Sequence, residues 1–292
     1  MIYILENEQL RVKVSSVGAE LQSIRRIDDG TEYLWQGDAT YWARRASNLF
    51  PVCGRLWDNQ YIYRSKTYLM GSHGFARGKE WSVLHQTGNV LTLQLTPDEE
   101  TLEAYPFRFT LQMTYTLTEE SLAVTTIVHN EDDKEMPFAV GGHPGFNVPL
   151  TEGSVYEDYK LVFDEPCQPL KFICDANCFY LDKMTLFPLE ENRVLPLQHS
   201  LFDDDAIFLE KASRGVTLCS DKSAHSVHLA FPDSPYLGIW HTPRTEAPFV
   251  CIEPWVAAPS RAGAVANLED RTDMIQLEPA GVYRNTYTIT FR

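Results

Sequence analysis

The stretch from Leu111 to Val128, LQMTYTLTEESLAVTTIV, determines how we expect the chain to fold. Apolar and polar residues alternate on both sides of the short polar segment Thr118–Ser121. Successive side chains of a β-strand point to opposite faces, so this period of two predicts two half-buried strands. The polar segment between them has the composition of a turn.

The same alternation recurs at Leu91–Leu95, Val227–Phe231 and Tyr287–Phe291, whereas helical periodicity is weak. We expect short helical turns only near Ala39–Ala46 and Leu268–Ile275. The sequence has no βαβ alternation and no GxGxxG motif after a strand, which argues against a dinucleotide-binding fold. It therefore predicts an all-β protein, a large antiparallel β-sandwich with few short helices.

No linker, internal repeat or low-complexity segment interrupts the 292 residues. A chain of this length can form one large domain or two smaller ones. Because the sequence marks no boundary, we expect a single domain over residues 1–292, with two stacked β domains as the alternative.

The formal net charge of −15 disfavours binding to nucleic acid or to an anionic membrane. No apolar run approaches the roughly 18 residues of a membrane helix. The N-terminal residues Met1–Glu6 lack the basic region of a secretory signal. We expect a cytoplasmic protein, monomeric or homodimeric, whose partner is a small molecule.

The six cysteines show no spacing typical of a metal site. Cys174 and Cys178 are four positions apart, but no second pair of Cys or His follows at zinc-finger spacing. In a reducing compartment such thiols are mostly small core residues, so we expect neither a metal site nor a disulfide.

One titratable side chain, His143, lies within the glycine- and proline-rich stretch Gly141–Pro149, GGHPGFNVP. Proline biases the residue before it away from helix, and glycine permits backbone angles that other residues resist. We expect an irregular or strand-end backbone that holds the imidazole at a fixed angle. Because histidine exchanges protons near neutral pH, His143 is a candidate acid or base, with a buried structural histidine as the alternative.

A second candidate, Glu253, ends the apolar run Phe249–Ile252 and precedes Pro254 and Trp255. Desolvation should raise the pKa of a carboxyl group in these surroundings, which suits a general base. The alternative is an edge-strand glutamate that faces water.

Three further residues are candidates for binding. Arg55 follows a glycine and could donate forked hydrogen bonds, although a structural ion pair explains it equally well. His73, among small residues, could handle protons, act as a neutral hydrogen-bond partner or occupy a turn. Asp205 ends the acidic triplet Asp203–Asp205 before a strand-like run and could point into a pocket, although such triplets are usually solvated loops.

Together, these segments resemble the aldose 1-epimerase (galactose mutarotase) family, and more closely its LacX-like bacterial branch. Seven sequence segments carry the resemblance, occur in the family's order and span nearly the whole chain. They are Tyr41–Arg45, Asn48–Leu56, His73–Arg77, His143–Asn147, Asp205–Phe208, Phe231–Trp240 and Cys251–Trp255.

The resemblance implies a galactose mutarotase-like supersandwich that interconverts the α and β anomers of a hexose without cofactor or metal. By matching motifs, His143 resembles the general acid and Glu253 the general base. Arg55, His73 and Asp205 resemble the residues that hold sugar hydroxyls. After Trp255, LacX-like chains tend to continue with a glycine and then an acidic residue, whereas this chain has Val256–Ser260, a loop that could help set sugar specificity.

Ring opening needs one acid and one base on different sides of the small sugar ring, so we expect them on separate segments, as His143 and Glu253 are. Unperturbed pKa values of about 6.5 and about 4.3 leave a window with the imidazole protonated and the carboxyl ionised. Two other functions stay open: a hexose-6-phosphate epimerase using Arg44, Arg45 and Arg77, and a non-catalytic sugar-binding or sensor protein. A cupin-like metalloenzyme lacks support because its clustered His/Glu spacing is absent.

Overall fold

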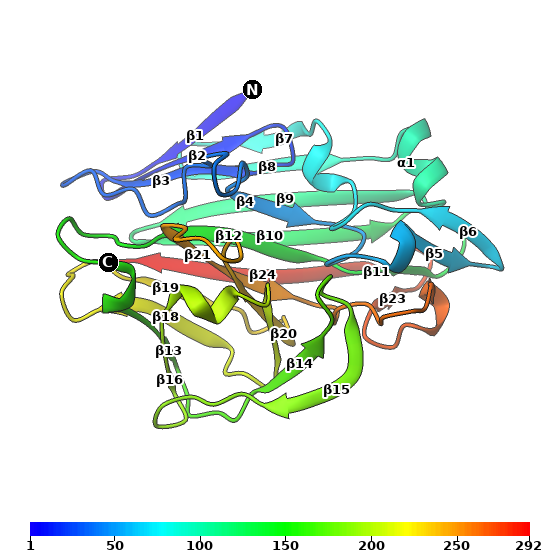
Figure 1. The fold of residues 1–292 in the computed structure, drawn as a ribbon. Coiled ribbons are helices and arrows are strands. Elements are labelled where there is room, and N and C mark those ends of the chain that lie inside the picture. Colours follow the sequence, from blue (N-terminus) through cyan, green and yellow to red (C-terminus); the bar gives the residue numbers. More distant parts are fainter.

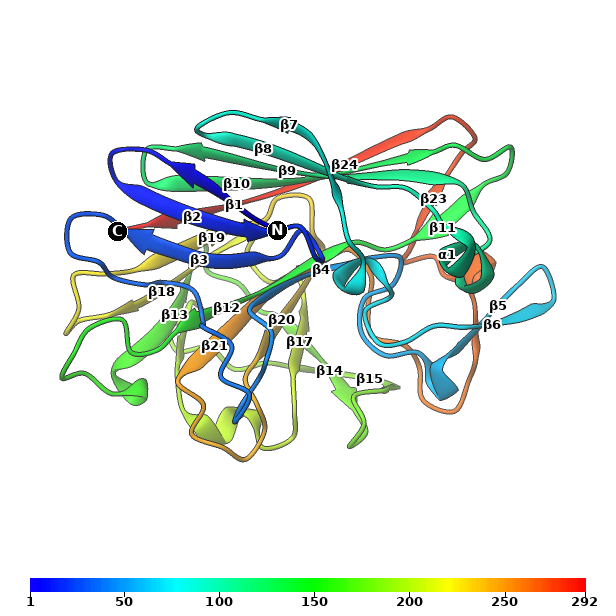
Figure 2. The same ribbon diagram turned by 90° about the horizontal axis from the view of Figure 1, so that it is seen from above.

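Two large antiparallel sheets form the frame of the molecule (Figure 1). The computed structural model describes residues 1–292, which form 24 strands, one α-helix and five short 3-10 helices. The predicted all-β fold is therefore confirmed. Seen from above, a small sheet of the first three strands lies beside the large ones (Figure 2).

The larger sheet has nine strands in the order β16-β13-β18-β19-β24-β10-β9-β8-β7. Its strands are β7 (Ser82–Gln86), β8 (Val90–Leu95), β9 (Phe109–Thr118), β10 (Ser121–Asn130), β13 (Tyr159–Phe163), β16 (Val194–Pro196), β18 (Gly215–Ser220), β19 (Val227–Ala230) and β24 (Val282–Phe291).

The second sheet has seven strands in the order β15-β14-β17-β20-β21-β12-β4. Its strands are β4 (Ala46–Leu49), β12 (Gly141–Asn147), β14 (Leu170–Cys174), β15 (Tyr180–Leu186), β17 (Ile207–Glu210), β20 (Tyr236–Trp240) and β21 (Phe249–Trp255).

Three small sheets complete the fold, and only the pairing of β22 with β5 is parallel. They comprise β1 (Ile2–Glu6), β2 (Leu10–Ser15) and β3 (Leu21–Arg26); β5 (Gln60–Tyr63), β6 (Lys66–Leu69) and β22 (Ala266–Asn267); and β11 (Met136–Phe138) with β23 (Ile275–Leu277).

The stretch quoted from the sequence forms the hairpin β9–β10. Leu111 pairs with Val128 and Leu117 with Leu122, so the apolar residues of both strands share one buried face. Glu119 takes a positive φ of 47° in the turn. The two predicted strands and the turn between them are confirmed.

Helices are few and short. The segment Ala39–Ala46 contains a turn in which the Trp42 N–H donates to the Asp38 carbonyl at 2.9 Å, and Leu268–Ile275 contains the 3-10 turn η5 (Leu268–Asp270), so a short turn is present at both expected places. The single α-helix, α1 (Glu99–Ala104), was not predicted. Its local signal is a capping box, in which the Asp98 side chain accepts a hydrogen bond from the backbone of Thr101. The other 3-10 helices are η1 (Trp57–Asn59), η2 (Ala76–Gly78), η3 (Tyr156–Asp158) and η4 (His199–Phe202).

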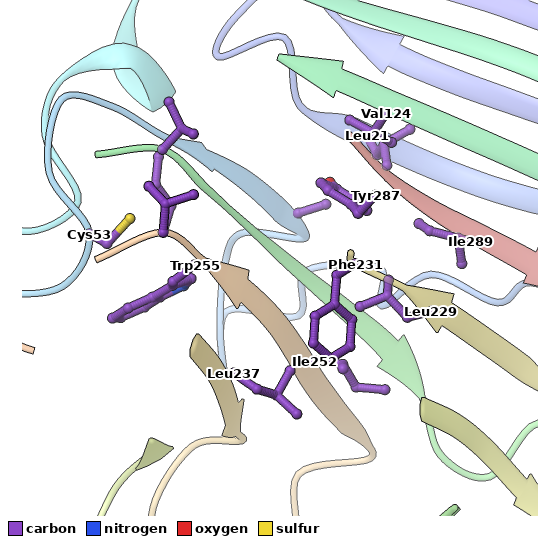
Figure 3. Packing of buried hydrophobic residues seen from close by; sticks show 14 of the residues in the cluster. Leu21, Cys53, Val124, Leu229, Phe231, Leu237, Ile252, Trp255, Tyr287 and Ile289 are labelled. Atoms are coloured by element: carbon purple, nitrogen blue, oxygen red, sulfur yellow. The ribbon is translucent and has the colours of Figure 1, made fainter. Parts of the chain in front are cut away.

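The main core lies between the two large sheets and is one cluster of 70 buried residues. Ile252 of the seven-stranded sheet faces Leu229 and Ile289 of the nine-stranded sheet (Figure 3). This continuous core supports the prediction of a single domain, which stays a prediction. No helix has the length and apolar character needed to cross a membrane.

Candidate active site

A pocket of about 350 Å³ is lined by all five residues that the sequence singled out. They come from separate parts of the chain: His143 from β12, Glu253 from β21, and the others from three loops. The residues are Arg55, His73, His143, Asp205 and Glu253.

His143 lies inside strand β12, paired with Ser47 of β4, so the expected irregular or strand-end backbone is wrong. The glycines around it have no positive φ. Their small size matters instead, because a Cβ on Gly142 would lie 2.8 Å from the ring of Tyr287 in the facing sheet. Since neighbouring side chains of a strand point oppositely, His143 points away from that core and into the pocket.

Glu253 lies opposite His143 on the adjacent strand. The flanking pairs Gly141–Trp255 and Gly145–Cys251 fix this register. Opposed side chains on one face of an antiparallel pair come into contact, and here His143 Nε2 and Glu253 Oε2 are 3.3 Å apart. Glu253 is only 2% exposed and His143 8%. The alternative of a glutamate facing water is therefore wrong.

Burial shifts the pKa values of both members of this pair. It raises the pKa of Glu253 well above its usual range, and the nearby Asp205 charge adds to the rise. Burial lowers the pKa of His143 to about 3, and the charges of Arg77 and Arg44 contribute. The raised Glu253 pKa agrees with the prediction, but the window expected from unperturbed values does not apply to this buried pair. The two shifts instead favour the neutral pair, with its one proton on Glu253.

Aromatic rings fix the imidazole of His143. Trp42 stacks on it with ring centroids 4.8 Å apart and an angle of 24° between the planes. Trp240 and His73 meet it edge-on, at 5.7 Å and 5.3 Å. Ring contacts of this kind restrict rotation, so the imidazole is held in one orientation.

His73 is held by two backbone hydrogen bonds with Gly54. Its backbone N–H donates to the Gly54 carbonyl at 2.7 Å, and its Nδ1 accepts from the Gly54 N–H at 3.2 Å. An accepting Nδ1 leaves the proton of the neutral ring on Nε2. Burial and the charge of His143 lower the pKa of His73 well below its usual value. His73 is therefore a neutral hydrogen-bond donor rather than a second acid.

Asp205 is the member of the acidic triplet that enters the pocket, whereas Asp203 and Asp204 are exposed. Its Oδ1 accepts a hydrogen bond from Trp240 Nε1 at 2.8 Å, and its Oδ2 lies 3.4 Å from an Nη of Arg55. Arg55 also donates to the Asn177 carbonyl at 2.7 Å. Arg55 thus forms the ion pair considered as an alternative, and it also lines the pocket.

Three buried polar atoms of the pocket residues have no hydrogen-bond partner within the protein: His143 Nδ1, Glu253 Oε2 and Trp255 Nε1. Buried polar atoms are normally paired, and each unpaired one costs free energy. Such atoms can pair with a ligand rich in hydroxyl groups.

The one cluster with metal-ligand character overlaps the same pair. Single atoms of His143, Cys251 and Glu253 lie within 4.8 Å of one another. A metal needs the thiolate form of cysteine, yet burial raises the pKa of Cys251 well above its usual value. The arrangement therefore suits proton transfer better than metal binding.

The sequence did not identify every pocket residue. Trp42 belongs to one of the segments that carry the resemblance, but nothing in its spacing shows that it stacks on the imidazole of His143, about a hundred positions away. Cys178 was interpreted as an inert thiol, yet it lines the pocket, where burial raises its pKa to about 12. Pro259, from the divergent loop after Trp255, also lines the pocket.

Comparison with known proteins gives one consistent family. A family model described as aldose 1-epimerase matches residues 1–267. Protein LacX of Lactococcus lactis subsp. lactis is 38% identical over 98% of each chain. The uncharacterised protein YphB of Escherichia coli is 27% identical over 50% of this chain and 51% of its own.

Solved structures agree with this assignment. A galactose mutarotase related enzyme from Lactobacillus acidophilus superposes with a TM-score of 0.95 at 34% identity, covering 100% of this chain and 97% of its own. A galactose mutarotase-like protein from Lactobacillus casei gives 0.94 at 33% identity, with 100% of both chains covered.

Proposed function

Since this chain belongs to the aldose 1-epimerase family, we propose that it interconverts the α and β anomers of a hexose by acid–base ring opening and reclosure. The observation that carries the proposal is the buried contact of 3.3 Å between His143 Nε2 and Glu253 Oε2 inside a pocket. Two proton-exchanging groups that face one small space are what this reaction requires.

An aldose ring opens when its ring oxygen gains a proton and its anomeric hydroxyl loses one. His143 and Glu253 are 3.3 Å apart on adjacent strands, so the expectation that they lie on different sides of the ring is wrong. Both oxygens are bonded to the anomeric carbon, so neighbouring acid and base groups can reach them together. We assign proton donation to His143 and proton acceptance to Glu253. After rotation about C1–C2, each group reverses its role and the ring closes from the other face.

These roles require the pair's single proton to be on His143 when the sugar reacts. The neutral pair and the ion pair contain the same number of protons, so the change between them needs no exchange with solvent. Sugar hydroxyls bound to Glu253 would stabilise its carboxylate, because hydrogen bonds to the charged form lower the pKa of an acid. The proton then moves across the 3.3 Å contact to His143.

The remaining residues would position the sugar. The free Nε2–H of His73 is a donor for a sugar hydroxyl, and Asp205 offers acceptor oxygens held by Trp240 and Arg55. Flat indole faces such as that of Trp240 suit the C–H faces of a sugar ring. This set would orient the anomeric carbon toward the acid–base pair.

The main rival is a non-catalytic sugar-binding protein of the same fold. Such a protein has no need for a buried acid–base pair, which favours an enzyme. The test adds purified protein to freshly dissolved α-D-glucose and α-D-galactose and follows the anomeric NMR signals. Acceleration above buffer supports the proposal, whereas sugar binding without acceleration supports the rival.

A further inference from the structure

Two neighbouring arginines, one of which lines the pocket, have no acidic partner. Arg77 lines the pocket from the turn η2, four residues after His73, and Arg44 lies beside it. No carboxylate oxygen lies within 4.0 Å of a nitrogen of either group. By contrast, Arg55, the other arginine of the lining, faces Asp205.

One hydrogen bond links the two residues. An Nη of Arg44 donates a hydrogen bond to the Arg77 carbonyl at 3.2 Å, whereas the Arg77 guanidinium makes no hydrogen bond within the protein. Burial and the charge of Arg44 lower the pKa of Arg77. Both side chains are half-buried, so water compensates these charges only in part.

The nearby acids do not balance this charge. Glu20 is the carboxylate that acts on Arg77, but its Oε1 accepts backbone hydrogen bonds from Arg45 and Ala46 at 3.0 Å and 3.1 Å. Burial favours the protonated, neutral form of Glu253 by raising its pKa. A chain with net charge −15 thus has an uncompensated positive region at its reaction site.

We propose that Arg77, backed by Arg44, forms an anion subsite of this pocket and that the substrate is a phosphorylated aldose. Arginine binds phosphate through paired N–H donors, and the two charges of a phosphate match the positive charges of these two neighbouring residues better than the single charge of a carboxylate does. The inference rests on the proposed function and narrows its substrate class. Arg45, also considered from the sequence, is instead hydrogen-bonded to Gln22.

The experiment measures kcat/KM for anomer exchange by NMR exchange spectroscopy on galactose and galactose 6-phosphate, and on glucose and glucose 6-phosphate. We expect the wild type to favour each phosphate by about tenfold or more, as a charge-assisted contact provides. Arg77→Gln should bring the ratio of kcat/KM for the phosphate to kcat/KM for the free sugar close to one. Arg77→Lys keeps the charge but loses the paired N–H donors of the guanidinium, so it should give an intermediate ratio. Using a ratio removes any general loss of activity from the comparison.

Arg11→Gln is the matched control. It removes the same charge from an exposed side chain on β2 that pairs with Glu6, and it should leave the ratio unchanged. Galacturonate is the second control, and a preference for it equal to that for the phosphate would overturn the phosphate assignment.

Two outcomes separate this inference from the proposed function. A wild-type ratio near one, or an unchanged ratio in Arg77→Gln, overturns the anion subsite, while rapid exchange of the free sugars still supports a mutarotase. If no sugar is exchanged, the mutarotase proposal fails and calorimetry with glucose 6-phosphate decides the subsite. Binding that weakens about tenfold in Arg77→Gln supports the subsite, and equal binding overturns it.

Discussion

The hairpin β9–β10 and the strand pair β12–β21 meet the same core with different side chains. In β9, buried apolar residues alternate with partly exposed polar ones, whereas every residue of β21 is buried. The hairpin buries almost only apolar groups on its inner face. The strand pair also buries His143 and Glu253, on the face opposite the core.

This difference separates the residues that stabilise the fold from those to which we assign the reaction. Apolar burial stabilises the hairpin, at roughly 25 cal/mol per Å² removed from water. A buried titratable pair with unpaired polar atoms costs free energy instead. Our proposed reaction gives a reason for such a pair in a fully buried strand, and the predictions below test that separation.

The largest expected effect is on turnover. His143→Asn removes the proposed acid while keeping a polar side chain of similar shape, and should lower kcat by about 10²–10⁴-fold with little change in unfolding. Because the pair acts as a unit, adding Glu253→Gln should lower kcat little further. Steady-state rates from the anomeric NMR signals provide the check, and near-normal kcat in His143→Asn would contradict its role.

The hairpin should respond in the opposite way. Leu111→Ala, at a site that is 1% exposed, should lower the free energy of unfolding by about 2–5 kcal/mol. The protein that remains folded should keep its kcat. Urea denaturation measures this loss, with the neighbouring Gln112→Ala on the other face as control, expected to cost about 1 kcal/mol or less. A large fall in kcat for Leu111→Ala would contradict the claim that the hairpin contributes to stability and not to turnover.

A smaller effect is the pH dependence of stability at Glu253. Between the unfolded pKa of about 4.3 and the raised folded pKa, the folded state binds a proton that the unfolded state has released. The contribution of this group to wild-type stability should therefore fall as pH rises, by at most about 1.4 kcal/mol per pH unit. Glu253→Gln removes this dependence.

The mutant should thus gain stability relative to wild type between pH 5 and pH 8, measured by urea denaturation. The exposed Glu246→Gln, in the loop before β21, is the control and should change stability little. A Glu253→Gln protein that loses stability relative to wild type as pH rises would contradict the raised pKa, because it would show that the carboxylate form stabilises the fold.

The smallest expected effect is on the pH dependence of the reaction. The active pair holds one proton between the His143 pKa of about 3 and the raised pKa of Glu253. Enzymatic kcat/KM, after subtraction of the spontaneous rate, should therefore stay nearly constant between these two pKa values. A decline of about tenfold per pH unit above pH 6.5 would indicate an unperturbed histidine pKa.

Local patterns predicted the strands but not their neighbours. The alternation from Leu111 to Val128 predicts two half-buried strands joined by a turn, and this prediction is confirmed. The strand β12 was missed because glycine and proline usually break strands. Here Gly142 is needed because only a residue without Cβ fits against Tyr287, a contact made between two sheets.

The candidate site was predictable where residue chemistry conflicts with its surroundings. Glu253 is conspicuous as an acid after an apolar run, and its raised pKa follows from burial alone. The pKa of His143 depends on neighbours from distant segments, so it could not be predicted from the residues next to His143 in the sequence. The same holds for the stacking of Trp42 and for the missing partner of Arg77.

The most direct test is the rate of anomer exchange of freshly dissolved α-D-galactose, and of its 6-phosphate, with wild-type and Glu253→Gln protein. The account predicts clear acceleration by the wild type with at least one of them, and a loss of about 10²-fold or more in the folded mutant. Equal acceleration by both proteins, or none by the wild type, would contradict a mutarotase that depends on the His143–Glu253 pair.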